Sequence, residues 1–409
     1  MIPWLRRLTN VWCTAIHKCL VPTGTEKGDT CNQRCKCDHL AVIWRVALLV
    51  LVALGLGACS EAMSAGLSQH GHPGNGHTIS PSKSPRKPAT PYVTSCGTSL
   101  CFDGSTWIEK GGTGYGQYDT PSTLVAEAQS GKLNTIELVE FDTRYHQLSD
   151  AESAATWNRL DQVIADAGNA GLHVVMNLSE FGQSLQAAGY TMSSASWQPE
   201  WNQYLSFIAS RTNTVRGVKY GSDPTIAMVE LWGEIPAPNL SNPVGTAAQM
   251  QGWYSATTAE WHSLAPNILV SSGGFSYLNE SGAAGIPWQQ IMRDPNNATC
   301  DMEIHSIGDR DVTTPMVTKY CQGIGKPWFL SAWSSCLKPP RSSTVLDGYA
   351  TDAQMATHAA AMYAIASGHS PATHRALGAD FWNLGPATTN TCQLGPQFPL
   401  TWAVVQGAP

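Results

Sequence analysis

Residues 222–236 read Ser-Asp-Pro-Thr-Ile-Ala-Met-Val-Glu-Leu-Trp-Gly-Glu-Ile-Pro, and this stretch is the most informative part of the chain. An Asp-Pro turn leads into a short apolar run, and a carboxylate, Glu234, and a proline follow that run. The run is too short for a confident helix and apolar enough for a buried strand. A glutamate at the end of a buried strand costs free energy unless it has a partner or a function. Glu234 is therefore a candidate site residue, and a salt-bridged structural glutamate is the alternative.

Strand and helix patterns alternate on both sides of this run. Helices are expected at 151–170 (ended by Gly171), 201–211, 247–264 and 352–367. Strands are expected near 106–111 and at 133–141, 172–178, 226–231, 267–272, 302–305, 327–331 and 379–383. Eight strands mostly separated by helices predict an α/β fold, a closed (β/α)8 barrel. In such a barrel the position of Glu234, just after a strand, is where catalytic residues lie.

Composition excludes some classes of protein and favours others. The net charge is −6, only 13% of the 409 residues are charged, and no basic stripe is visible, so we expect no nucleic-acid partner. The chain has 15 Trp and 12 Tyr against 8 Phe. Trp and Tyr combine a flat apolar face with a polar group and suit stacking on sugar rings, although any single Trp is more often a core residue.

The N-terminal part predicts export. Val46 to Ala58 is an apolar segment of signal-peptide length that follows Arg45. It ends in Leu-Gly-Ala-Cys59, which resembles a bacterial lipobox with Cys59 as the lipidated residue; an ordinary secretory signal is the alternative. We expect residues 1–59 to be an over-called start plus a lipoprotein signal peptide, 60–90 a disordered Ser/Pro/Gly/His linker, and 91–409 a single folded domain.

The cysteines agree with export. Six follow Cys59, an even number that fits three disulfides in an oxidising compartment. Cys96 with Cys101 is the natural local pair. The other four allow three pairings, of which Cys300–Cys321 and Cys336–Cys392 are favoured on loop closure alone. The cysteines before Cys59 show no zinc spacing, and we expect neither a metal nor another cofactor.

From about Phe102 onward the chain resembles glycoside hydrolase family 5, the family of retaining cellulases and β-mannanases. Each matching segment is weak alone, and their order and spacing together are more specific. The segments are Asp103-Gly-Ser-Thr-Trp107, Lys132–Ile136, Asn177–Phe181, Arg211–Tyr220, Asp223–Ile226, Ser271–Gly274 and Gly325–Leu330.

The resemblance implies a mechanism with two carboxylates across the scissile bond. Glu234 matches the general acid/base that follows strand four. Gly233 stands where the family usually has an asparagine that contacts the sugar 2-hydroxyl, although Trp-Gly-Glu is similar to the mannanase branch. At strand seven the family pattern Lys-Pro-x-x-x-x-Glu ends here in Ala332, so the nucleophile position is vacant. A methyl group cannot attack an anomeric carbon.

Two further departures affect the same side of the site. The strand-two arginine aligns with Glu137, and the strand-six His-x-Tyr aligns with His305-Ser-Ile307. Glu303 and Asp380 are possible substitute carboxylates, because each lies two residues before a predicted site residue and so on the same face of its strand; both being packed or paired elsewhere is the alternative. Glu137 is a third possible substitute carboxylate, and it is expected either to pair with a new partner or to join an acid cluster.

Other candidate residues are expected to bind sugar. Trp382 fits the family's floor tryptophan, and His305 its substrate-facing histidine. The remaining candidates for the cleft are Trp232, Gly233, Trp333, Asn177 and Glu180.

The sequence thus predicts an exported, family 5-like protein that binds or cleaves β-1,4-linked mannan or glucan. The missing nucleophile favours weak or lost hydrolysis, a pseudoenzyme. The alternatives are an active β-mannanase or cellulase that uses Glu303 or Asp380, and a non-catalytic surface scaffold. We expect a monomer, held by its lipid at the outer face of the cytoplasmic membrane or secreted, with a polysaccharide as its partner.

Overall fold

The computed structural model describes residues 92–115, 120–147, 149–239, 242–276, 285–337, 348–365, 378–385 and 392–408. The predictions made for residues 1–59, for Cys59 and for the linker 60–90 lie outside the described residues. They remain predictions.

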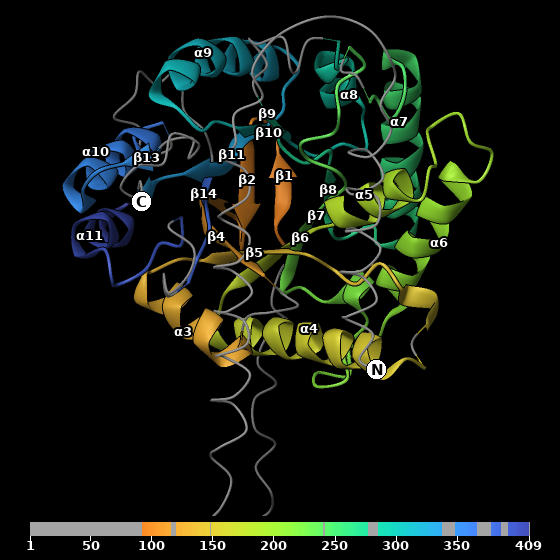
Figure 1. The fold of residues 1–409 in the computed structure, drawn as a ribbon, viewed down its shortest axis with the longest axis horizontal. Coiled ribbons are helices and arrows are strands. Elements are labelled where there is room, and N and C mark those ends of the chain that lie inside the picture. Colours follow the sequence, from red (N-terminus) through yellow and green to blue (C-terminus); the bar gives the residue numbers. More distant parts are fainter. Residues whose placement is uncertain are drawn as a thin grey trace, which may run out of the picture. The chain divides into compact units, whose positions relative to one another are not determined.

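The centre of the fold is a nine-stranded parallel sheet with the order β8-β7-β6-β5-β4-β14-β11-β10-β9 (Figure 1). Its strands are β4 (Glu109–Tyr115), β5 (Thr135–Val139), β6 (His173–Asn177), β7 (Ile226–Glu230), β8 (Leu269–Ser271), β9 (Phe275–Ser276), β10 (Cys300–Glu303), β11 (Trp328–Ser334) and β14 (Gly378–Trp382). The two ends of the sheet, β8 and β9, are consecutive in the chain, and β8 pairs with β7 while β9 pairs with β10. Residues 269–276 are therefore one barrel strand split in two, and the predicted eight-stranded (β/α)8 barrel is confirmed.

Helices surround this barrel (Figure 1). They are α3 (Pro121–Ser130), α4 (Ala151–Ala170), α5 (Ser179–Ala187), α6 (Trp197–Ser210), α7 (Ala247–Leu264), α8 (Trp288–Arg293), α9 (Ile307–Gly323), α10 (Asp352–Tyr363) and α11 (Pro399–Gly407). Short 3-10 turns, η2 (Tyr145–Gln147) and η3 (Tyr220–Ser222), and a small two-stranded sheet, β12 (Cys336–Leu337) with β13 (Gly348–Tyr349), complete the connections. None of the helices in the described ranges is long and apolar enough to cross a lipid bilayer.

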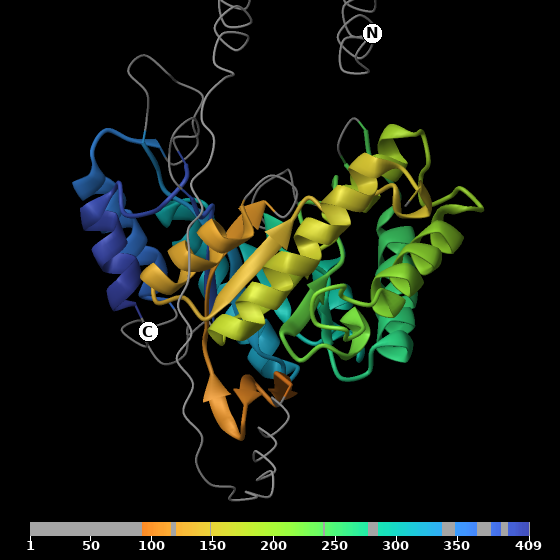
Figure 2. The ribbon, with the colours of Figure 1, turned by 90° about the horizontal axis from the view of Figure 1, so that it is seen from below.

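A small antiparallel sheet precedes the barrel. It consists of β1 (Thr94–Cys96), β2 (Ser99–Phe102) and β3 (Ser105–Trp107). The rings of Phe102 and Trp107 meet the His173 ring edge to face at centroid distances of 4.7 and 5.5 Å. Because His173 is the first residue of β6, this sheet covers the amino ends of the barrel strands (Figure 2). The opposite, carboxyl ends of the barrel strands are therefore where we look for a functional site.

Local sequence signals located most elements well. The helices expected at 151–170 and 247–264 have those bounds, and Gly171 adopts the left-handed conformation that ends α4. Thr246 caps α7 through a capping box with Gln249. The first barrel strand is the main deviation, since it runs from 109 to 115 rather than from 106 to 111. The residues before it belong instead to the covering sheet.

The three disulfides pair as expected: Cys96–Cys101, Cys300–Cys321 and Cys336–Cys392. The second joins β10 to α9. The third closes the longest loop, with a sequence separation of 56, which constrains the unfolded chain most.

A buried carboxylate on α4 organises the segment that leads into β7. Asp161 is fully buried and accepts hydrogen bonds from Arg211 Nε (3.0 Å) and Nη2 (2.6 Å). It also accepts from the Thr214 amide and hydroxyl and from the Tyr220 hydroxyl at 2.6 Å. The turns at residues 211–220, which precede β7, therefore depend on the side chain of Asp161.

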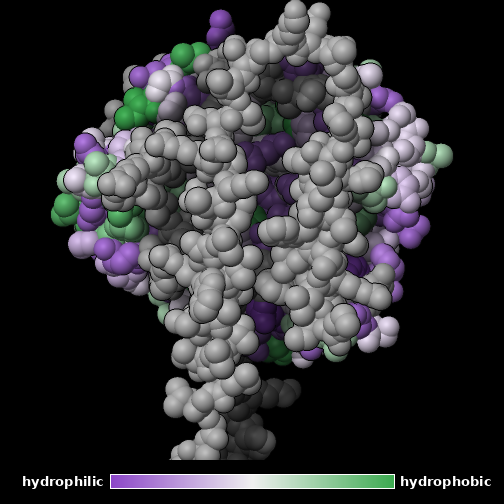
Figure 3. Space-filling model, in the orientation of Figure 1, coloured by the Kyte–Doolittle hydropathy of each residue, from purple (hydrophilic) through white to green (hydrophobic). Residues whose placement is uncertain are grey.

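The surface in view shows no dominant apolar patch among the residues that are coloured. Figure 3 shows hydrophobic residues as separate small areas among hydrophilic ones. Of the exposed large hydrophobic residues, Ile307 and Val312 lie on α9, whereas Val215 and Leu400 belong to other segments. Scattered apolar residues of this kind need no partner.

We predict that Asp161→Asn lowers the free energy of unfolding by about 3–5 kcal/mol, because it leaves the mostly buried guanidinium of Arg211 without its counter-charge. Urea titration monitored by circular dichroism measures this change. The matched control is Glu152→Gln, which breaks an ion pair with Arg144 in which the Glu152 side chain is 80% exposed, and it should cost no more than about 0.5 kcal/mol. Equal effects of the two substitutions would contradict the prediction.

Candidate active site

A cavity of about 490 Å³ opens at the carboxyl ends of the barrel strands. This is the size of a small-ligand site. Nine of the residues predicted from the sequence line it: Glu137, Asn177, Glu180, Gly233, Glu234, Glu303, His305, Ala332 and Trp382. Six lining residues were not predicted: Val139, Ser179, Gln183, Ser334 and the disulfide-bonded Cys336 and Cys392.

The backbone holds Glu234 at the edge of this cavity. Leu231 and Trp232 continue the parallel pairing past β7 by donating to the carbonyls of Ser271 and Ser272. Glu234 then donates its amide to the Gly274 carbonyl at 2.9 Å. Its φ of 49° lies in the left-handed region, which is uncommon for a residue other than glycine. Such strain is retained where the surrounding structure fixes it, and it aims the carboxyl into the cavity.

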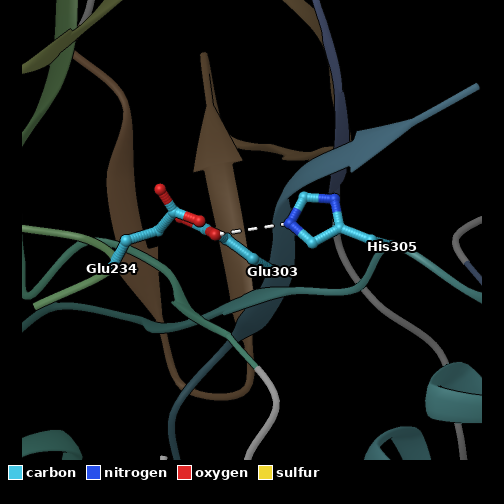
Figure 4. Close-up of side chains that lie close together, drawn as sticks. All are labelled: Glu234, Glu303 and His305. Atoms are coloured by element: carbon cyan, nitrogen blue, oxygen red, sulfur yellow. Dashed lines mark ion pairs between the residues drawn. The ribbon is translucent and has the colours of Figure 1, made fainter. Parts of the chain in front are cut away.

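A second carboxylate, Glu303 at the end of β10, faces Glu234 (Figure 4). One oxygen of each carboxylate and one ring nitrogen of His305 all lie within 4.8 Å of one another. Glu303 Oε2 accepts a short hydrogen bond from the Ser276 hydroxyl and lies 3.6 Å from His305 Nε2. The Ser334 hydroxyl is 3.5 Å from the other ring nitrogen of His305.

The two carboxylates are too close for both to be ionised easily. The negative charge of Glu303, followed by burial, raises the pKa of Glu234 to about 7, while His305 and Ser276 oppose the shift. A carboxyl with a pKa near 7 can hold a proton at neutral pH, as a general acid must.

Position 332, where the family pattern has its nucleophile, is occupied by an alanine that also lines the cavity. Ala332 is the direct register partner of Glu303, and its carbonyl accepts the amide of Ile304 at 2.9 Å. Glu303 thus reaches the cavity from β10, the strand that pairs with the part of β11 that carries Ala332. Of the three carboxylates predicted as substitutes, Glu303 and Glu137 line the cavity and Asp380 does not.

The remaining predicted substitute, Asp380, lies elsewhere. It is 1% exposed, points into the barrel below the cavity and adjoins Glu109 on the neighbouring strand. A glycine lies across from each carboxyl, Gly111 opposite Asp380 and Gly378 opposite Glu109. A Cβ atom at either glycine would collide with the facing acid. The prediction that Asp380 serves the cleft is therefore corrected, because glycine partners let it pack inside the barrel.

Two predicted sugar-stacking residues also lie in the core. Trp232 is 1% exposed and packs between Trp197 and Trp253, in space left by Gly182. Trp333 is fully buried, with its ring near Tyr363 and Phe381. Both are neighbours of cavity residues in sequence, but the strand alternation turns their side chains outward to the helices. Trp382 does line the cavity, and its ring meets Tyr115 at 5.5 Å.

Asn177 connects buried acids to the loop that bears Glu234. Its amide donates to Glu137 Oε1 (2.8 Å) and to Glu230 Oε2 (3.1 Å). Its carbonyl accepts from the Ser179 hydroxyl, which in turn accepts the Gly233 amide at 3.1 Å. Glu137 also accepts from Thr113, so it has joined an acid cluster, one of the two outcomes expected for it. Asn177 and Ser179 form part of the wall and set its shape.

Glu180 extends the acidic wall of the cavity. Burial raises its pKa to about 7, with smaller contributions from Glu140 and Glu137. The described part of the chain offers no hydrogen-bond partner to its Oε2 atom. Glu180 thus lines the cavity, as predicted.

Sequence reasoning had no signal for Ser179 and Ser276. Serines near strand ends are common, and only the tertiary structure brings the Ser276 hydroxyl to Glu303 and the Ser179 hydroxyl to Asn177 and the Gly233 amide. Glu234, Glu303 and His305 also form a donor set that a divalent cation accepts. The expectation of no metal stays a prediction.

Comparisons with known proteins agree with this fold. No family model matches the chain. The chain is 24% identical over 344 residues, 72% of its length and 71% of the relative's, to "Mannan endo-1,4-beta-mannosidase 3" of Oryza sativa subsp. japonica. It also resembles the solved endo-1,4-β-mannanase of Rhizomucor miehei, with a TM-score of 0.60, 16% identity and coverage of 78% of this chain and 99% of that one.

A further structural likeness is to a glycoside hydrolase family 5 mannosidase from Rhizomucor miehei, with a TM-score of 0.57, 12% identity and coverage of 78% and 96%. The chain therefore has the (β/α)8 fold of the family 5 mannanases, as its sequence resemblance implied.

The buried acids under the cavity predict a pH-dependent stability. Burial raises the pKa of Glu109 to about 8 from an ordinary 4.5, helped by Glu230, Asp301 and Glu137. Between these two values the folded state binds more protons than the unfolded state, so stability is greatest below about 4.5 and is lost as the pH rises toward 8. Glu109→Gln mimics the protonated acid. It should reduce the loss of stability between pH 5 and pH 8 by about 2–4 kcal/mol in urea titrations.

The control for this substitution is Asp103→Asn in an exposed turn, which should leave the pH dependence as in the wild type. The prediction is wrong if Glu109→Gln and the wild type lose the same stability over this pH range.

Proposed function

We propose that this chain is a retaining glycoside hydrolase that cleaves β-1,4-linked polysaccharide, with Glu234 as general acid/base and Glu303 as nucleophile. The observation that carries the proposal is the approach of these two carboxylates within 4.8 Å at the carboxyl ends of the barrel strands. Retaining glycosidases place their two carboxyl groups about 5–5.5 Å apart, and inverting enzymes about 6.5–9.5 Å apart to admit a water. With one oxygen of each carboxylate inside 4.8 Å of the other, the pair leaves no room for the water of an inverting enzyme, and the retaining arrangement is the nearer of the two.

The surroundings of the two acids support distinct roles. Glu303 receives hydrogen-bond donation from Ser276 and has His305 beside it, which suits an ionised nucleophile. Glu234, whose pKa is raised to about 7 first by Glu303, suits a proton donor near neutral pH. Surroundings that push the pKa values of two neighbouring acids apart in this way indicate which one is the general acid and which one is the nucleophile.

The reaction then proceeds in two displacements. A Glu303 oxygen attacks the anomeric carbon while Glu234 gives its proton to the departing glycosidic oxygen, which breaks the C–O bond and leaves a glycosyl ester on Glu303. The deprotonated Glu234 next takes a proton from a water molecule. That water attacks the same carbon, releases Glu303 and yields a sugar with its original anomeric configuration.

Substrate class comes from the relatives and from the cavity. The relatives named above are mannanases and a mannosidase, so β-1,4-mannan is the first substrate to test, with glucan second. Trp382 offers a half-buried ring on the cavity wall, the kind of surface on which a pyranose stacks. Carboxylates at Glu137 and Glu180 and the amide of Asn177 supply hydrogen-bonding groups for hydroxyls.

Export as a lipid-anchored or secreted monomer is part of the same proposal. The lipobox at Cys59 and the three disulfides support it, since disulfides of this kind persist in oxidising compartments. A polysaccharide too large to enter a cell needs an enzyme outside it.

Glu234→Gln and Glu303→Gln should each lower the hydrolysis of β-mannan on the order of 10³-fold, because each removes one half of the double displacement. Reducing-end assays measure the rates, and NMR of the first product should show a retained β-anomer. The matched control is Asp380→Asn, another predicted substitute, which should keep activity within a few-fold of the wild type. Full activity of Glu303→Gln would exclude the proposed nucleophile.

A second candidate function, a pseudoenzyme that binds polysaccharide without cleaving it, rests on the alanine at position 332. Ala332→Glu separates the two candidates, because it restores the family's strand-seven carboxylate. In a pseudoenzyme this substitution, combined with Glu137→Arg, should create measurable hydrolysis. In the proposed enzyme Ala332→Glu should lower activity, since a third carboxylate next to Glu303 raises the cost of ionising the pair. Initial rates on mannan decide between these outcomes.

A further inference from the structure

Ser276, on the short half-strand β9, contacts both proposed catalytic carboxylates. Its hydroxyl donates a short hydrogen bond to Glu303 Oε2 and also interacts with the Glu234 carboxyl. Ser276 is the register partner of Glu303 in the parallel pair β9–β10, so backbone pairing fixes the two side chains next to each other.

The split of the fifth barrel strand creates this position. Gly273 has a φ of 82°, a left-handed conformation that turns the chain between β8 and β9. A side chain at Gly274 would collide with the Glu303 side chain and with the Ser331 hydroxyl. The Gly274 carbonyl also accepts the Glu234 amide. Residues 273–276 therefore fix the backbone of Glu234 and contact the side chain of Glu303.

We propose that Ser276 is a positioning residue that holds the Glu303 carboxyl in place and aims it into the cavity. This inference rests on the proposed function. A hydroxyl carries one proton, so a hydroxyl that donates to Glu303 Oε2 cannot donate to Glu234 at the same time. The hydrogen bond to Glu303 Oε2 therefore orients this carboxyl and not that of Glu234.

The groups around Glu303 make this donor important. The titratable side chains facing it are Glu234, Glu230 on β7, and His305 on its own connection. Two of these three repel a charge on Glu303, and His305 lies at 3.6 Å rather than at the distance of a close hydrogen bond. From β11 the facing residue is Ala332, which donates nothing. Ser276 therefore provides the closest donor contact that Glu303 has among the described residues.

The test is the pH profile of hydrolysis by Ser276→Ala on β-mannan. The acidic limb of kcat/KM, where the carboxylate pair loses its first proton, should move up by about one pH unit. At the optimum kcat should fall about tenfold with a smaller change in KM, because the hydroxyl acts on the nucleophile and not on the substrate. Ser276→Thr, which keeps the hydroxyl, should restore both. A profile of Ser276→Ala that superimposes on the wild type overturns the proposal.

The matched control is Ser335→Ala. The Ser335 hydroxyl is buried and donates to the Met355 carbonyl at 3.3 Å, outside the cavity lining. This variant reports the effect of losing a buried serine hydroxyl near the same strand ends. It should leave the pH profile in place, and an equal shift in Ser335→Ala would overturn the proposal.

A second measurement separates this inference from the proposed function. Carboxyl-carbon NMR of protein labelled at glutamate, assigned with Glu234→Gln and Glu303→Gln, follows the titration of the pair without any substrate. Ser276→Ala should raise the pH of the first proton loss even if the wild type hydrolyses no polysaccharide tested, in which case the proposed function alone fails. Hydrolysis together with an unchanged titration in Ser276→Ala refutes the role of Ser276 alone.

Discussion

The repulsion between two carboxylates held within 4.8 Å is the constraint on which the site depends. Two negative charges this close repel each other, and the charge of Glu303 is the largest cause of the raised pKa of Glu234. Ser276 donates to Glu303 Oε2, and His305 Nε2 lies 3.6 Å from the same oxygen. In the proposed enzyme, this unequal environment gives two identical side chains different roles.

Acidic side chains are also buried in the barrel interior below the cavity. (β/α)8 barrels usually fill their interior with branched apolar side chains. Here Val175, Met228 and Phe329 form only a small apolar cluster, and Glu109, Glu137, Glu230, Asp301 and Asp380 are buried beside it. Burial raises the pKa of each of these acids. Raised pKa values favour the neutral forms of these acids. Glu137 and Glu230 accept hydrogen bonds from Asn177, and Glu137 and Asp301 accept from the hydroxyls of Thr113 and Thr299.

Much of the fold could be predicted from local patterns. The period of the apolar residues and the caps gave α4 and α7 at their observed bounds, because these signals act over a few residues. The first strand was misplaced since residues 105–107 read as a strand equally well whether they join the barrel or the covering sheet. In the site, Glu234, Glu303 and His305 were predicted and do meet. Trp232, Trp333 and Asp380 were predicted and do not, since one residue of difference along a strand turns a side chain to the opposite face.

By itself, the sequence determined the alternation of strands and helices, the even set of cysteines and a glutamate at the end of the fourth strand, because each is written in neighbouring residues. It also showed a methyl group where a nucleophile belongs. Only the tertiary structure decided what faces Glu234. Glu303, Ser276 and Gly274 come from other strands, and their approach depends on the register of β9, β10 and β11, which no local pattern encodes. Ala332 stands where the family pattern has its strand-seven glutamate, and its register partner on the adjacent strand, Glu303, lines the same cavity.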